Sequence, residues 1–164
     1  MSGTRFWLLA DTHFGHEKMH EYCGRPEGYE EQIIQNLMSC CDAHNDVIIH
    51  LGDFCVYRDE YWHDQFMSHC MGRKWLIRGN HDRKSLTWYL AHGWNFVADQ
   101  VVLNAFGKRI MLSHRPLPES PDWDLNIHGH LHNADHHPES KTSQIHQLIA
   151  MEHRYCPVNL RNIV

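Results

Sequence analysis

The sequence predicts a layered α/β fold with mixed sheets, and three observations support this. In the first half of the 164-residue chain, short apolar runs that stop at polar residues alternate with longer segments of helical periodicity. The second half is richer in strand-like runs bounded by turn residues. The chain shows no internal repeat, linker or low-complexity segment, so we expect one domain over residues 1–164.

The first half supplies three buried strands and three helices. We expect strands at residues 6–10, 47–51 and 75–78, because each is a short apolar run that ends at a polar or glycine residue. Residues 30–41 and 59–70 have apolar side chains three and four positions apart, which is helical spacing. Residues 85–92 are expected to form a shorter helix capped by Gly93.

The second half is expected to add the two strands of a hairpin and further strands toward the end of the chain. Residues 101–104 and 109–113 flank a turn at 105–108. Further strands are expected at 124–128, at 147–151 and in an edge segment at 158–163. Helix-rich and strand-rich halves together favour layers of helices on mixed sheets.

Composition narrows the function classes. Hydrophobic residues make up 42% and charged residues 21%, which is typical of a globular protein. The chain lacks the roughly 18–20 consecutive apolar residues of a membrane span, and its first apolar run is too short for a signal peptide, so we expect a cytoplasmic protein. The six cysteines contain no CxxC pair and are expected to be free thiols. A net charge of −5 without a basic block disfavours binding of long nucleic acid.

Polar residues follow each of the first three expected strands. Asp11 and His13 come directly after the first strand, Asp53 after the second, and Asn80 and His81 after the third. Ligands of open α/β sheets bind outside the carboxyl ends of the strands. We therefore expect these side chains to meet at one edge of a sheet.

The second half adds histidines at two more strand ends. One strand ends at His114, and another is followed by His130 and His132. Side chains two positions apart point the same way in extended chain, so His130 and His132 are expected to face one ion, as are Asp11 and His13.

The gathered side chains indicate a site for two metal ions. Oxygen and nitrogen donors of this kind suit divalent first-row metals, with Mn expected first and Fe, Co, Ni or Zn as alternatives. Seven ligands are too many for one catalytic ion, but two ions that share a carboxylate would use them. Asp53 is the expected bridge, because its strand should lie between the other two. The candidate ligands are Asp11, His13, Asp53, Asn80, His114, His130 and His132.

These motifs, taken in order, resemble those of the calcineurin-like metallophosphoesterase family. The matching pieces are D11-T-H13, G52-D53, G79-N80-H81-D82, S113-H114 and G129-H130-L-H132, which extend over most of the chain. The resemblance implies a four-layer α/β/β/α sandwich with two mixed sheets and a dimetal site at the strand ends. It also implies two ligand sets that share Asp53: Asp11, His13, Asp53 and His132 for one ion, and Asp53, Asn80, His114 and His130 for the other.

The resemblance also implies a catalytic role for His81, Asn80 and Asp53, in which His81 contacts the phosphate and assists the leaving group. The run at residues 11–16, DTHFGH, and the short chain resemble small bacterial and phage-encoded members. The sequence departs from protein phosphatases of the family, because Val56 stands where they carry the Asp that orients the catalytic His. A Ser/Thr protein phosphatase is therefore disfavoured, and the sequence does not identify the residue that orients His81.

The expected function is hydrolysis of a phosphodiester or phosphomonoester by a metal-bridging hydroxide, with His81 as the proton donor. The expected substrate is small and phosphorylated, a nucleotide among the candidates. His16 and Arg115 are expected to contact the phosphate. The alternatives are a metal-dependent nuclease on short single strands, a single-ion hydrolase and a catalytically silent binding scaffold on the same fold.

Overall fold

The computed structural model describes residues 3–41, 44–133 and 142–164. Its first sheet has the order β4-β3-β2-β1-β9, and its strands are parallel except for antiparallel β9. These strands are β1 (Phe6–Leu9), β2 (Val47–His50), β3 (Arg73–Ile77), β4 (Phe96–Ala98) and β9 (Val158–Asn159). Strand β2 thus lies between β1 and β3, as the sequence predicts for the strand that carries Asp53.

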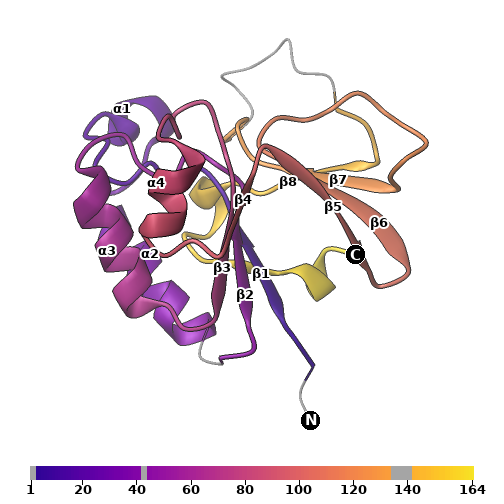
Figure 1. Cartoon of the computed structure of the whole chain (residues 1–164). Coiled ribbons are helices and arrows are strands. Elements are labelled where there is room, and N and C mark those ends of the chain that lie inside the picture. Colours follow the sequence, from indigo (N-terminus) through magenta and orange to yellow (C-terminus); the bar gives the residue numbers. More distant parts are fainter. Residues whose placement is uncertain (1–2, 42–43, 134–141) are drawn as a thin grey trace.

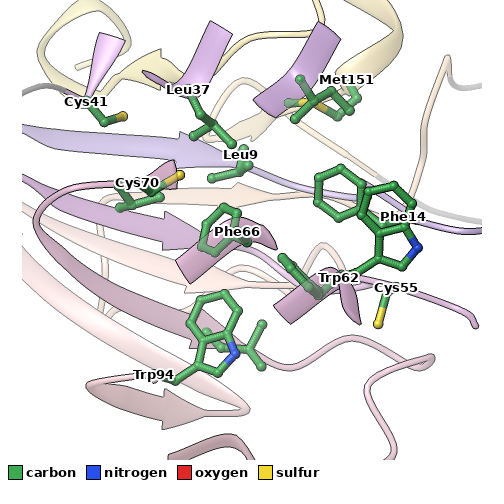
Figure 2. Close-up of a cluster of buried hydrophobic side chains, with 14 of the residues drawn as sticks. Leu9, Phe14, Leu37, Cys41, Cys55, Trp62, Phe66, Cys70, Trp94 and Met151 are labelled. Atoms are coloured by element: carbon green, nitrogen blue, oxygen red, sulfur yellow. The ribbon is translucent and has the colours of Figure 1, made fainter. Parts of the chain in front are cut away.

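Four helices lie on one side of this sheet (Figure 1). They are α1 (Met19–Cys23), α2 (Tyr29–Cys40), α3 (Asp59–His69) and α4 (Leu86–Ala91). Leu9 of β1 packs with Leu37 of α2 and Phe66 of α3 in the core that helices and sheet share (Figure 2). The neighbouring residue Leu8 points to the opposite face, as alternation in a strand requires.

The second sheet packs against that opposite face and has the order β5-β6-β7-β8. Its strands are β5 (Gln100–Ala105), β6 (Lys108–Ser113), β7 (Leu125–His128) and β8 (His146–Leu148). Strands β5 and β6 form the expected hairpin, in which Phe106 and Gly107 both have positive φ, the signature of a two-residue type I′ turn. Leu8 and Ile49 meet Ile110 and Ile127 in the core between the sheets.

The α/β sandwich with two mixed sheets is confirmed, but the structure differs from a four-layer arrangement on the far side. After Ala91 the only helices among the described residues are two short 3₁₀ helices, η1 (Met151–His153) and η2 (Leu160–Asn162). On β5, Gln100, Val102 and Asn104 are exposed, so the outer face of this strand of the second sheet is open to solvent. All α-helices of the described residues lie on the first sheet, so none of them forms an outer layer on the second sheet.

Several element boundaries also differ from expectation. The strand expected at 147–151 is shorter, because Met151 begins η1, and the segment expected at 158–163 divides into β9 and η2. Helix α1 and strand β4, of five and three residues, were not anticipated, since elements this short carry little periodicity. No helix in the described ranges is long and apolar enough to cross a bilayer.

Candidate metal centre

The loops that follow the strands hold the candidate ligands in left-handed backbone conformation. The φ angles are 53° for Asp11, 47° for His13, 57° for Asp53, 71° for His130 and 48° for His132. The expectation of extended chain at these positions is therefore wrong. Asp and His tolerate this region better than most residues, and here hydrogen bonds between loops hold it, including Asp11 N to Gly52 O at 2.9 Å and His13 N to Asp53 O at 3.0 Å.

This backbone separates His130 from His132, which were expected to face one ion. His132 lies with Asp11 and His13, whereas His130 lies with Asp53 and His114. Both groups have their ligand atoms within 4.8 Å of one another. Asp11 and His13 lie in the same group, although the extended-chain argument for this does not hold.

The first cluster is built by Asp11, His13 and His132. Asp11 Oδ1 lies 3.9 Å from Nε2 of His13 and 3.9 Å from Nε2 of His132. Asp11 Oδ1 and both ring nitrogens of His13 are buried without a hydrogen-bond partner among the described residues. Burial strongly lowers the pKa of His13, so its ring is neutral and can offer a lone pair. An unpaired carboxylate oxygen and a neutral imidazole that converge in the interior are suited to a cation.

The second cluster centres on His114. Its Nδ1 lies 2.9 Å from the carbonyl of Leu51, which fixes the ring by donation from that nitrogen. Its Nε2 lies 3.4 Å from Asp53 Oδ2, 3.2 Å from Asn80 Oδ1 and 3.1 Å from Nδ1 of His130. Burial opposes charge on His114, but the hydrogen bond to Asp53 and the nearby Asp11 raise its pKa to about 9. The surroundings therefore favour a positive charge at this point.

Asp53 connects the two clusters. Its Oδ2 lies 3.7 Å from Nε2 of His13 and 3.4 Å from Nε2 of His114, which belong to different clusters. Burial opposes ionisation of Asp53, but the hydrogen bond and charge of His114, the charge of His13 and the N–H of His81 together outweigh it and hold the pKa of this carboxyl well below its usual range. An ionised carboxylate between two groups of ligands is the arrangement required of a bridge.

Two residues that sequence reasoning missed support the first cluster. Glu152 of η1 accepts from Nδ1 of His132 at 3.1 Å, which leaves His132 Nε2 directed toward Asp11. The guanidinium of Arg25, fully buried, donates to Glu152 and to the carbonyls of Asp11 and Thr12. No motif surrounds either residue, and 127 positions separate them, so the sequence carried no signal for the pair.

Asp82 and the neighbouring glycines shape the second cluster. The Asp82 carboxylate accepts from the backbone N–H of Asp53, Phe54 and Gly79 at 2.8, 3.1 and 2.7 Å. A Cβ at Gly79 would collide with the Asp53 carboxylate, and one at Gly129 would collide with that of Asp11. Both positions therefore need glycine because a ligand carboxylate approaches the backbone closely.

The three remaining predicted site residues lie around the clusters. His81 donates its backbone N–H to Asp53 Oδ1, and its Nε2 lies 3.9 Å from Asp53 Oδ2. Among the described residues none forms a hydrogen bond with the His81 ring, so its orienting partner is not identified. His16 and His81 line a hollow of about 270 Å³ beside the first cluster. Arg115 is exposed, with Nη2 3.4 Å from Asn80 Oδ1.

His50 and His128 make hydrogen bonds to the loops around the clusters. His50 Nδ1 accepts from Gly52 N–H at 3.1 Å, and its Nε2 lies 3.0 Å from Thr12 Oγ1. Thr12 in turn donates to the carbonyl of Phe54. His50 therefore joins the loops behind the clusters rather than facing them. His128 is buried, with Nδ1 2.9 Å from the carbonyl of Gly129.

The fold and these clusters can be compared with known proteins. No protein-family model matches the chain. A protein of unknown function from Aquifex aeolicus superposes with a TM-score of 0.79 at 27% identity, and the match covers 98% of each chain. Nuclease MPE from Pseudomonas putida gives a TM-score of 0.51 at 25% identity over 77% of this chain and 61% of the nuclease.

A novel archaeal phosphodiesterase shares the fold with a TM-score of 0.55 at 15% identity, over 89% of this chain and 82% of that one. The five motifs that resemble the family all lie at strand ends or in the loops after them, and they meet at the junction of the two sheets. This fold and these structural neighbours support the resemblance of the chain to the calcineurin-like metallophosphoesterase superfamily.

Proposed function

We propose that this protein is a dinuclear metal-dependent phosphodiesterase. The observation that carries the proposal is the position of Asp53 between two clusters of buried ligand atoms. One cluster contains a carboxylate oxygen and imidazole nitrogens without hydrogen-bond partners in the described structure. The other favours positive charge around His114. Hydrolysis of phosphate esters with metal ions is the chemistry that such paired sites support.

The donor set fits two divalent cations. One would be held by Asp11, His13, Asp53 and His132, and the other by Asp53, Asn80, His114 and His130. Carboxylate, amide and imidazole donors accept Mn, which we propose as the first choice over Fe, Ni, Co and Zn. When bound, such ions supply positive charge to the phosphoryl oxygens and acidify the attacking water.

His81 is positioned to protonate the leaving group. Its ring is partly exposed and borders the hollow beside the first cluster. It meets the ring of His13 edge to face, with the ring centroids 5.3 Å apart. The hydrogen bond from its backbone N–H to Asp53 fixes the loop that carries it. A protonated imidazole at this place donates to the oxygen that departs into the hollow.

His16 and Arg115 are proposed phosphate contacts on opposite sides of the centre. His16 lies against His13 edge to face, with ring centroids 5.8 Å apart. Arg115 approaches the ligand amide of Asn80 from solvent. A phosphate bound over the clusters would therefore meet an imidazole on one side and a guanidinium on the other.

The test combines metal content with turnover. The purified chain, loaded with Mn²⁺ and desalted, is expected to hold two ions by elemental analysis and to hydrolyse bis(p-nitrophenyl) phosphate. Asp53→Asn should lower both metal content and turnover, and His81→Ala should lower turnover while leaving two ions bound. Asp64→Asn on the surface of α3 is the matched control. A chain that holds one ion, or that binds two without turnover, would contradict the dinuclear enzyme and favour the single-ion or silent alternative.

A nuclease on short single strands is a second candidate, favoured by the 25% identity to nuclease MPE. Two exposed cations near Asn80 add to this, because Arg83 Nε lies 3.3 Å from the Asn80 carbonyl and Arg115 lies at its amide. Cleavage of single-stranded oligonucleotides with kcat/KM above that for bis(p-nitrophenyl) phosphate would select the nuclease. Cleavage of the small diester alone would exclude it.

A further inference from the structure

The hollow beside the first cluster is lined mainly by aromatic and imidazole rings. Met19, Tyr22 and Cys23 of α1 line it together with His13, His16, His81 and His132. No Asp, Glu, Lys or Arg is among the lining residues. Apart from its imidazoles, the lining offers a phosphate no cation from the chain, whereas an aromatic ring would find the faces and edges of other rings.

Tyr22 supplies the largest free ring surface at this place. Its side chain is 51% exposed although α1 packs on the fold, and its ring meets His16 edge to face with centroids 5.8 Å apart. Exposed aromatic rings beside a phosphate site are the surfaces on which nucleobases stack. His81, the proposed proton donor, borders the same hollow, so this is the side toward which the leaving group departs.

The neighbouring surface opposes a further negative charge. A second hollow of about 550 Å³ shares His16 with the first and is lined by Glu17, Glu27 and Glu30. Arg25 also lines it, but the guanidinium of Arg25 is bound to Glu152 and to backbone carbonyls. A substrate that continued past the leaving group would therefore bring its next phosphate toward three carboxylates. The exposed cations Arg83 and Arg115 lie instead near Asn80, which belongs to the second cluster.

We propose that the hollow lined by Tyr22 binds the leaving group of the diester as a terminal, uncharged nucleoside, and that the chain rejects substrates with another phosphate on that side. This inference rests on the proposed phosphodiesterase function. An enzyme with this site would remove a nucleoside from the end of a short strand or from a nucleotide diester. Any further phosphates of the substrate would lie on the side of Arg83 and Arg115.

The first experiment measures binding without metal or turnover. Thymidine is titrated into the metal-free protein, and its affinity is followed by saturation-transfer NMR. Tyr22→Leu is expected to weaken binding about tenfold, and Tyr22→Phe, which keeps the ring, to change it less than twofold. Tyr61→Leu on α3, also an exposed tyrosine, is the matched control and should leave binding unchanged. Equal affinity in wild type and Tyr22→Leu would overturn the proposal.

The second experiment tests rejection of charge with Mn²⁺-loaded protein. The dinucleotide TpT is compared with pTpT and TpTp, which add one phosphate at either end. One of these two should be cleaved with kcat/KM at least tenfold below that of TpT, and the double variant Glu27→Gln, Glu30→Gln should restore most of the loss. Equal rates for all three would overturn the proposal. If thymidine binds through Tyr22 but no diester is hydrolysed, the nucleoside site stands and the proposed phosphodiesterase fails.

Discussion

His63 makes the stability of this protein depend on pH in a way that can be measured. The ring is buried in α3 among Phe54, Trp88 and Trp94, with centroids 4.4, 4.9 and 6.0 Å away. Its Nδ1 lies 2.8 Å from the Asp59 carbonyl, and its Nε2 has no partner in the described structure. Burial lowers the pKa of His63 from 6.5 to about 4. Replacement by leucine removes the titrating group and keeps an apolar side chain.

The sign and size follow from proton linkage. The pKa of His63 is lower in the folded than in the unfolded chain, so acid favours the unfolded chain, which binds the proton first. The stability is fully present above pH 6.5 and is lost progressively as pH falls toward 4. Between pH 7 and pH 5 His63 lowers the free energy of unfolding by about 2 kcal/mol, because roughly 1.5 pH units of that interval lie between the folded and unfolded pKa values of His63.

The assay is urea unfolding at pH 7 and pH 5, in EDTA so that metal binding does not contribute. The decrease in unfolding free energy between the two pH values should be about 2 kcal/mol smaller in His63→Leu than in wild type. His69→Leu is the control, because His69 is exposed on the same helix. An equal decrease in His63→Leu and wild type would refute the reasoning.

Three further predictions concern the supports of the metal centre. Glu152→Gln is expected to weaken Mn²⁺ affinity at the first cluster about 10- to 100-fold, measured by calorimetry, since His132 loses its charged partner; unchanged affinity would contradict this. Asp82→Ala should lower the unfolding free energy by at least about 3 kcal/mol, because three buried N–H groups lose a carboxylate acceptor, and a loss below about 1 kcal/mol would speak against that role. Gly79→Ala should abolish metal uptake by displacing Asp53, whereas Gly3→Ala, with nothing within 4 Å, should leave it intact.

The meeting of the strand ends was predictable from the sequence because it follows from chain direction. Parallel strands separated by helical segments place their carboxyl ends on one edge, so Asp11, Asp53 and Asn80 had to come near one another once β2 lay between β1 and β3. The histidines of the second sheet reach the same place because that sheet packs on the first through residues such as Leu8 and Ile127.

The left-handed ligand backbone could not be predicted in the same way. It depends on hydrogen bonds between loops that lie about forty residues apart, such as His13 N to Asp53 O. The Arg25–Glu152 pair likewise depends on where η1 comes to lie, and a 3₁₀ helix of three residues leaves no periodic pattern. Helix α1, which carries Tyr22 to the hollow, is too short for its apolar spacing to stand out.

The left-handed conformation of Asp11 and Asp53 has a practical consequence. Asparagine is the side chain that most readily takes this backbone geometry after glycine, and it has nearly the same shape as aspartate. Asp11→Asn and Asp53→Asn chains should thus keep the native loops while losing ligand charge. Such variants are the natural starting point for trapping an uncleaved substrate in a crystal.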